Sequence, residues 1–209
     1  AATVSQVASS LVLSDTVPTF ASLTDTTQLT ATVKDANTNV ISDATVTWAT
    51  SDTTIATVSD AGLVTSVANG TATITATSGL ASATAAVTVA QVAASITLSP
   101  PDSLVFVTPG DTATVTATVK DALGSVMAVS PTLTWSSSDT TTATVNSTGL
   151  VTAVARGLAT ITAQTGDVTA TLKARVKGSY VAVTVTGDGD PLPDVSVWLT
   201  DPTGTSTKK

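Results

Sequence analysis

The stretch VTWATSDTTIATVSDAGLVTSVANGTATITATSG, residues 46–79, returns almost unchanged as LTWSSSDTTTATVNSTGLVTAVARGLATITAQTG, residues 133–166. An alignment that starts at Ala44 and Pro131 needs no gap, and 23 of its 36 positions are identical. Shorter matching blocks upstream extend the repeated unit to about residues 7–89 and 92–176. A unit of roughly 85 residues has the size of a domain, not of a solenoid repeat. The sequence therefore predicts two tandem domains, each with its own core.

Hydrophobic residues alternate with threonine inside each unit. In QLTATV, residues 28–33, Leu29, Ala31 and Val33 fall on one face of a single predicted strand, and ATITAT, residues 72–77, repeats this pattern. A period of two marks half-buried strands, and turn-forming Gly, Asn and Asp residues separate the runs. About seven short strands per unit, with no helical period, predict an all-β fold of two β-sandwiches.

The composition removes several classes of function. The chain has no His and no Cys, and all 15 acidic residues are Asp. It therefore lacks an imidazole base, a thiol nucleophile and the usual ligands of zinc or haem. A net charge of −7 argues against nucleic acid and anionic membranes as partners. No apolar run is long enough to span a bilayer. We therefore expect no enzyme activity, no cofactor, no nucleic-acid partner and no membrane span.

The connections between units predict a rod. Only Ala90 and Gln91 separate the two repeats, with no Gly/Ser or Pro-rich tether. So short a junction favours a semi-rigid rod over domains joined by a flexible linker. We place the first domain at residues 1–90 and the second at 91–177. Residues 178–209 contain only two predicted strands, at residues 180–186 and 195–199, which makes them a partial third β domain or a strand-donating tail.

The repeated motif resembles the signature of bacterial immunoglobulin-like domains, group 2. Twelve positions carry the resemblance in the first copy: Trp48, Ser51, Asp52, Ala56, Thr57, Val58, Gly62, Leu63, Val64, Gly70, Ala72 and Ile74. The second copy carries the same residue types from Trp135 to Ile161. The resemblance implies immunoglobulin-like sandwiches on bacterial surfaces, as in invasin- and intimin-like stalks, or on phage virions. It implies no catalytic residues.

The last segment carries a second resemblance and the best cluster of oxygen ligands. VTVTGDGDPLPDVSVWLTDPTGT, residues 183–205, is similar to the first hairpin of carboxypeptidase-regulatory-like or collagen-adhesin B-type domains, although Asp194 stands where that pattern prefers Gly. Asp188, Asp190 and Asp194 form a candidate Ca²⁺ site, since Ca²⁺ takes six to eight oxygen ligands. The alternative is a solvated hairpin turn, which Asp and Gly favour for backbone reasons.

Each unit has one tryptophan, Trp48 or Trp135. The favoured interpretation is a core anchor, and the alternative is an aromatic platform for a sugar. Asp52 and Asp139 occur once per repeat, so they cannot form the close carboxylate pair of a glycosidase, and we expect them to cap turns.

Two sequence patterns match sites of covalent modification, and each also has a simpler interpretation. Lys34 and Lys120 raise the idea of a Lys–Asn isopeptide bond, but the adjacent Asp35 and Asp121 fit strand-ending turns more simply. The sequons at residues 69–71 and 146–148 match the N-glycosylation pattern, which arises by chance in a Thr-rich chain.

These observations favour a non-catalytic extracellular structural protein, a surface stalk or a fibre subunit. Its expected partners are further copies of itself, joined through exposed strand edges into a homo-oligomer or homopolymer. The alternative is an adhesin or phage-virion module that binds a cell-surface receptor or carbohydrate.

Overall fold

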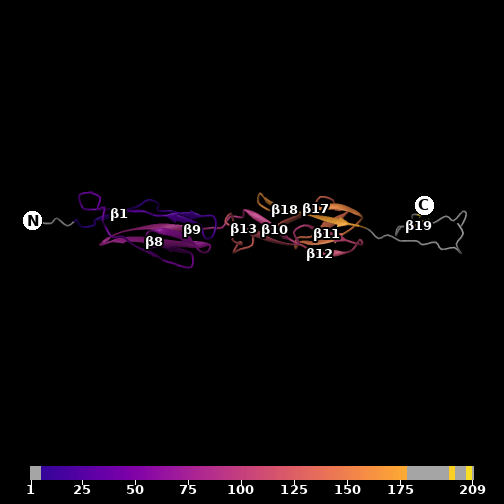
Figure 1. Ribbon diagram of the computed structural model, residues 1–209, viewed down its shortest axis with the longest axis horizontal. Coiled ribbons are helices and arrows are strands. Elements are labelled where there is room, and N and C mark those ends of the chain that lie inside the picture. Colours follow the sequence, from indigo (N-terminus) through magenta and orange to yellow (C-terminus); the bar gives the residue numbers. More distant parts are fainter. Residues whose placement is uncertain (1–5, 178–197, 201–205, 209) are drawn as a thin grey trace, which may run out of the picture. The chain divides into compact units, whose positions relative to one another are not determined.

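The computed structural model describes residues 6–177, 198–200 and 206–208. The chain divides into two compact units, Ala1–Gly178 and Ser179–Lys209 (Figure 1). In the second unit, β19 (Trp198–Thr200) pairs with β20 (Ser206–Lys208) in antiparallel fashion. The candidate Ca²⁺ ligands Asp188, Asp190 and Asp194 lie outside the described residues, as does the predicted strand at residues 180–186.

Nine strands of the first unit form the first domain. They are β1 (Ser10–Leu13), β2 (Thr19–Phe20), β3 (Thr26–Gln28), β4 (Ala31–Lys34), β5 (Thr47–Thr50), β6 (Ala56–Val58), β7 (Leu63–Ser66), β8 (Gly70–Ser78) and β9 (Ala81–Val89). One sheet has the order β2-β9-β8-β5, and the facing strands pair as β1-β4 and β3-β7-β6. Only β2 and β9 run parallel.

The second domain repeats this topology. Its strands are β10 (Ser95–Ser99), β11 (Ser103–Phe106), β12 (Thr112–Thr114), β13 (Thr116–Lys120), β14 (Thr134–Ser137), β15 (Ala143–Val145), β16 (Leu150–Ala153), β17 (Gly157–Thr165) and β18 (Val168–Val176). The sheets have the orders β11-β18-β17-β14, β10-β13 and β12-β16-β15. The described residues contain no helix, and hence none that would cross a membrane. The chain is therefore all-β, as predicted, with two tandem immunoglobulin-like sandwiches.

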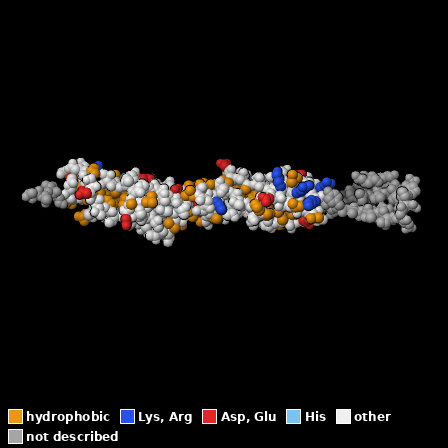
Figure 2. Space-filling model, viewed as in Figure 1, with side chains coloured by type: hydrophobic (Ala, Val, Ile, Leu, Met, Phe, Trp, Pro, Cys, Tyr) orange, Lys and Arg blue, Asp and Glu red, His pale blue; other side chains and the backbone are white. Residues whose placement is uncertain are grey.

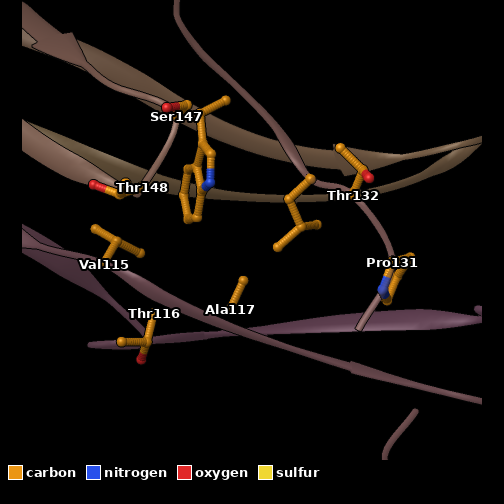
Figure 3. Close-up of a pocket in the computed structure, with 9 residues that line it drawn as sticks. Val115, Thr116, Ala117, Pro131, Thr132, Ser147 and Thr148 are labelled. Carbon is orange, nitrogen blue, oxygen red and sulfur yellow. The ribbon is translucent and has the colours of Figure 1, made fainter. Parts of the chain in front are cut away.

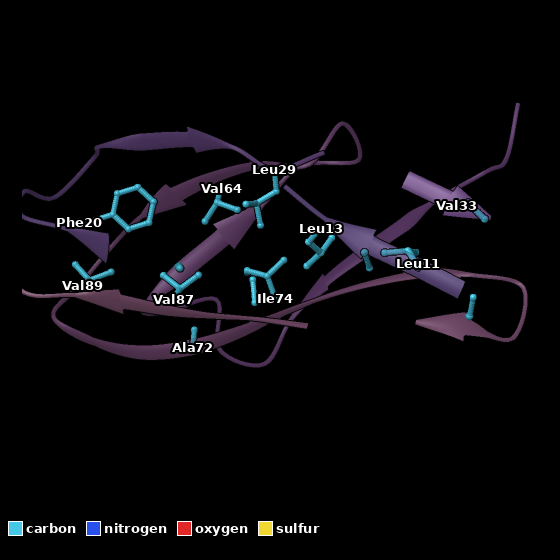
Figure 4. Close-up of a cluster of buried hydrophobic side chains, with 14 residues drawn as sticks. Leu11, Leu13, Phe20, Leu29, Val33, Val64, Ala72, Ile74, Val87 and Val89 are labelled. Atoms are coloured by element: carbon cyan, nitrogen blue, oxygen red, sulfur yellow. The ribbon is translucent and has the colours of Figure 1, made fainter. Parts of the chain in front are cut away.

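The alternating residues face inward between the two layers. Leu29, Val64, Ile74 and Val87 are almost fully buried in the first domain, where side chains from both layers meet (Figure 4). Ile161 and Val151 occupy the matching centre of the second domain. The outward positions of the same strands are mainly threonine, which has a high strand propensity and keeps that face polar.

The prediction of one continuous strand over residues 28–33 is wrong. The strand breaks at Leu29 and Thr30, so that β3 pairs with β7 while β4 pairs with β1. Hydrogen bonds from Leu29 N to Gly62 O and from Ser14 N to Thr30 O, both 2.9 Å, hold the break on either side. Leu29 nevertheless keeps its predicted inward direction, because burying this side chain decides the local register.

Gly62 packs against the indole ring of Trp48 in the first domain. Its φ of 81° lies in the left-handed region, and an added Cβ would approach Leu29 O to 2.5 Å and Trp48 Cζ2 to 2.8 Å. Gly149 has the same φ and meets Val115 O and Trp135 in the same way. The repeated Trp and Gly are thus parts of one packing arrangement. Both tryptophans are half-buried and pack against the core, which agrees with the anchor interpretation.

Candidate functional site: the junction between the two domains

The two residues between the repeats do not form a free tether. Ala90 N donates to Phe20 O and Val92 N to Ala21 O, both at 2.9 Å, so the chain leaves the first domain while still paired with it. Two residues later, Ala94 N donates to Lys120 O of the second domain at 2.9 Å. Backbone pairing therefore passes from one sandwich to the next with only Ala93 between the two sets of bonds.

Gln91 bonds to both domains. Its backbone N–H donates to Asn69 Oδ1 of the first domain at 2.9 Å. Its side-chain Nε2 donates to Asp121 Oδ2 at 2.9 Å and to Val126 O at 3.2 Å, while its Oε1 accepts from Ala128 N at 2.9 Å. A single side chain thus fixes the linker against three groups of the second domain.

Asp121 is the centre of the junction, and only 2% of its surface is exposed. Its Oδ1 accepts from Leu123 N at 3.1 Å and Ser125 N at 2.9 Å, which closes the turn after β13. Its Oδ2 accepts from Gln91 Nε2 and from Leu23 N, both at 2.9 Å. Since Leu23 belongs to the first domain, this carboxylate is hydrogen-bonded directly across the junction.

The hydrogen bonds keep this buried carboxylate charged. Burial by itself would raise the pKa of Asp121, but the bonds donated by Gln91, Leu23, Ser125 and Leu123 outweigh it, and the pKa lies below the ordinary value. A carboxylate that accepts several N–H bonds is stabilised in its ionised form. The junction therefore keeps its full set of acceptors at neutral pH.

The first domain carries a copy of this site at its outer end. Asp35 Oδ1 accepts from Asn37 N and Asn39 N at 2.9 Å, and its Oδ2 accepts from Gln6 Nε2 at 3.2 Å. The second donor to Asp35 Oδ2 is Asn39 Nδ2, at 3.2 Å, whereas the second donor to Asp121 Oδ2 is Leu23 N. The Asp35 site is thus completed by its own domain, whereas the Asp121 site is completed by a neighbour.

The outer end of the second domain also differs from the junction. In the repeat, Pro109 corresponds to Leu23. Proline has no backbone N–H, so this position cannot donate the bond that Leu23 gives to Asp121. The second domain therefore cannot use this residue to form the same junction with a domain that follows it.

The remaining predicted site residues have local roles. Asp52 Oδ1 accepts from Thr54 N at 2.8 Å, and Asp139 Oδ1 accepts from Thr141 N at 2.9 Å, which confirms the turn-capping role. The hydrogen bonds from Thr141 and Thr142 hold the pKa of Asp139 below its ordinary value. No group of three potential metal ligands occurs among the described residues.

The turn interpretation of Asp35 and Asp121 is confirmed by their bonds to the residues that follow them. The second sequon has a similar local role, because Asn146 Oδ1 accepts from Thr148 N at 3.0 Å and Leu150 N at 2.9 Å. Asn69, of the first sequon, instead bonds to Gln91 across the linker.

An open depression of about 500 Å³ lies beside Trp135. Val115, Ala117 and Pro131 form its apolar part, and hydroxyl-bearing residues such as Ser147 and Thr148 lie at its edge (Figure 3). The half-buried indole is thus accessible from this side. The sugar-platform alternative therefore has a specific surface beside Trp135.

Sequence reasoning missed the junction residues. The sequence pattern predicts only a turn at Asp121 and only a sequon at Asn69. A signal was available in the recurrence of Gln before each repeat, at Gln6 and Gln91, paired with the recurring Asp35 and Asp121. That the second pair also binds Leu23, 98 residues away from Asp121, depends on the packing of the domains.

Two tandem immunoglobulin-like sandwiches joined by a hydrogen-bonded linker define a modular β-protein. The chain belongs to the bacterial Ig-like domain (group 2) family, whose model matches residues 14–89 and 92–176. No curated protein matches the chain.

Several solved structures of surface proteins are similar to the chain. Domains 4 and 5 of the S-layer protein SbsC show 26% identity over 82% of this chain and 99% of that one, with a TM-score of 0.39. Domains 1–6 of SbsC show 23% identity over 97% of this chain, with a TM-score of 0.40, and the chain spans 32% of that structure. The Escherichia coli adhesin FdeC shows 21% identity over 83% of this chain and 66% of that one, with a TM-score of 0.42.

Proposed function

We propose that this chain is a non-catalytic extracellular structural protein, a surface stalk or fibre subunit in which Ig-like domains set distance and orientation. The observation that supports this most is the bonding of Asp121 to both the linker and the first domain. A domain pair held by a buried hydrogen-bonded carboxylate resists bending more than one joined by a free linker. Two tandem domains of this kind act as a spacer on a cell surface.

In the fibre version of the proposal, copies of the chain contact one another through the edges of their sheets. Because Pro109 cannot donate the bond of the junction, growth by repeating that contact is disfavoured, and the unpaired edges of the sheets are the alternative contact. Addition of a strand between copies is a heterologous contact that gives an open filament. The domain division at residues 1–90, 91–177 and 178–209 belongs to this proposal, with the last part as strand donor or partial domain.

Small-angle scattering and negative-stain microscopy of the whole chain test both versions. The stalk proposal expects one narrow distribution of distances between the two domains, which broadens in Asp121→Ala. A broad distribution in the unchanged chain would contradict it. The fibre version expects filaments or concentration-dependent oligomers, and a chain that stays monomeric by light scattering contradicts that version alone.

The second candidate function is an adhesin or virion module that binds a cell-surface receptor or carbohydrate. The depression beside Trp135 supports it, since an accessible indole with hydroxyl groups around it suits a sugar ring. A glycan array compares the chain with Trp135→Ala, and Trp48→Ala serves as the matched control. Hits that vanish only with Trp135→Ala support this function, and an array without hits counts against it.

A further inference from the structure

The outer face of β18 carries a row of cations. Lys173, Arg175 and Lys177 are exposed, and the residues between them point into the core. Side chains on one face of a strand repeat at about 7 Å, so these three charges extend over about 14 Å. Lys173 and Arg175 belong to β18 and Lys177 follows its last residue, and we call these three residues the β18 cation row. Figure 2 shows the blue side chains of the chain gathering on the second domain.

The neighbouring strands place apolar side chains beside the row. In the sheet register, Arg175 lies between Val105 of β11 and Leu158 of β17. Both are exposed, with 52% of the surface of Val105 and 57% of that of Leu158 open to solvent. Lys173 is held over β17 by a 3.1 Å hydrogen bond to Thr160 Oγ1. The surface thus combines spaced positive charges with exposed apolar contacts.

The first domain has none of these features at the matching positions. There the row across β2, β9 and β8 is Thr19, Thr88 and Thr71, in the same register. The positions matching Lys173 and Lys177 are Ala86 and Ala90. The β-sandwich therefore forms without the row, and no part of the fold requires the cations.

The charge of the chain is unevenly distributed. Residues 1–90 contain six Asp and one Lys, and residues 91–177 contain five Asp and five Lys or Arg. Arg156 lies in the turn before β17 and is already engaged within the molecule, so we do not count it in the row. A local row of positive charge with apolar neighbours attracts an anion even where the net charge is −7.

We propose that the β18 cation row binds a linear acidic polysaccharide, such as a polyuronic acid. Such a polymer presents carboxylates at intervals along its length, which matches charges spaced along a strand, and the C–H faces of its sugar rings suit Val105 and Leu158. A second copy of this chain fits less well. All six Asp residues of residues 1–90 lie outside strands, so they form no regular row that would match the cations.

The test measures binding of the whole chain to immobilised polygalacturonate, with neutral dextran for comparison. The variant Lys173→Ala/Arg175→Thr gives the row the residues that the first domain has at these positions, so it is expected to fold. Lys208→Ala/Lys209→Ala changes the net charge equally and is the matched control. We expect the first variant to lose about tenfold or more in affinity, since each cation near an anionic surface adds to binding, and the control to keep its affinity.

Salt and a transplanted row complete the test. Raising NaCl from about 0.02 M to about 0.5 M shortens the Debye length severalfold and is expected to abolish binding. Placing Ala86→Lys, Thr88→Arg, Thr19→Val and Thr71→Leu in the Lys173→Ala/Arg175→Thr variant is expected to restore it. Equal binding by the variant and the control would overturn the proposal. So would absence of binding to polygalacturonate, tighter binding to duplex DNA or anionic lipid vesicles, or self-association that the same variant removes.

Discussion

Replacing Asp121 with alanine tests whether the junction holds the two domains together. The change removes a 2% exposed carboxylate that accepts hydrogen bonds from Leu123, Ser125, Gln91 and Leu23. A hydrogen bond to a charged group contributes about 1.5–3 kcal/mol, and the turn bonds are partly replaced by water once the site opens. We therefore expect the free energy of unfolding of the second domain to fall by about 3 kcal/mol.

Asp35→Ala is the matched control, because it removes the same turn bonds at a site that is completed by its own domain. Its expected cost is about 1 kcal/mol, because the bonds that Asp35 accepts from Gln6 and Asn39 are exposed to water. The difference of about 2 kcal/mol measures how much more the buried bonds from Gln91 and Leu23 contribute at Asp121. Urea unfolding measures both variants. Hydrogen exchange of the Leu23 amide reports on the junction directly, and it should become fast only in Asp121→Ala.

Equal losses of stability in the two variants, or a Leu23 amide that stays protected in Asp121→Ala, would contradict this prediction. A cycle with Gln91→Ala adds a second check. Since Gln91 and Asp121 are directly bonded, the two substitutions together should cost less than the sum of their separate effects. Additive effects would mean that the 2.9 Å bond between these side chains adds nothing to stability.

Three further predictions concern the junction, the carboxylates and the glycine packed against the tryptophan. Leu23→Pro removes one donor and keeps Asp121, so scattering should show a wider range of domain orientations, and the second domain should lose about 1 kcal/mol, less than in Asp121→Ala; unchanged scattering would contradict this. The pKa values of Asp121 and Asp139 are lower in the folded chain than their ordinary value. The stability that these ionised carboxylates add is therefore complete above about pH 4–5, and it is lost as the pH falls through their pKa values in the folded chain. Urea midpoints should therefore be flat from neutral pH to about pH 5 and drop below pH 4, and a midpoint that rises on acidification would refute the sign. Gly62→Ala should lower the free energy of unfolding by about 2–4 kcal/mol, because the new Cβ meets Leu29 O. Gly110 has a φ of 93° and open space around it, so Gly110→Ala should lower it by about 1 kcal/mol only. Thermal unfolding compares the two variants.

Local patterns in the sequence were sufficient for the class of fold. Alternation at Ala72, Ile74 and Ala76 predicted the inward face of β8, and all three are buried. This works because a strand places every second side chain on the same face, whatever its neighbours are. The break at Leu29 was not predictable in this way, because the alternation continues through residues 28–33 while the hydrogen-bonding partners change from β7 to β1.

The sequence by itself determined the all-β class, the two repeats, their short linker and the inward residues, since each of these follows from local spacing and self-comparison. Only the tertiary structure decided that Asp121 bonds across the junction, and that Val105, Arg175 and Leu158 form one row. These contacts join residues far apart in the chain, and their register is set by how the strands and domains pack. The repeat of residues 46–79 at 133–166 thus specifies the scaffold, while the differences between the copies mark the places where the structure suggests function.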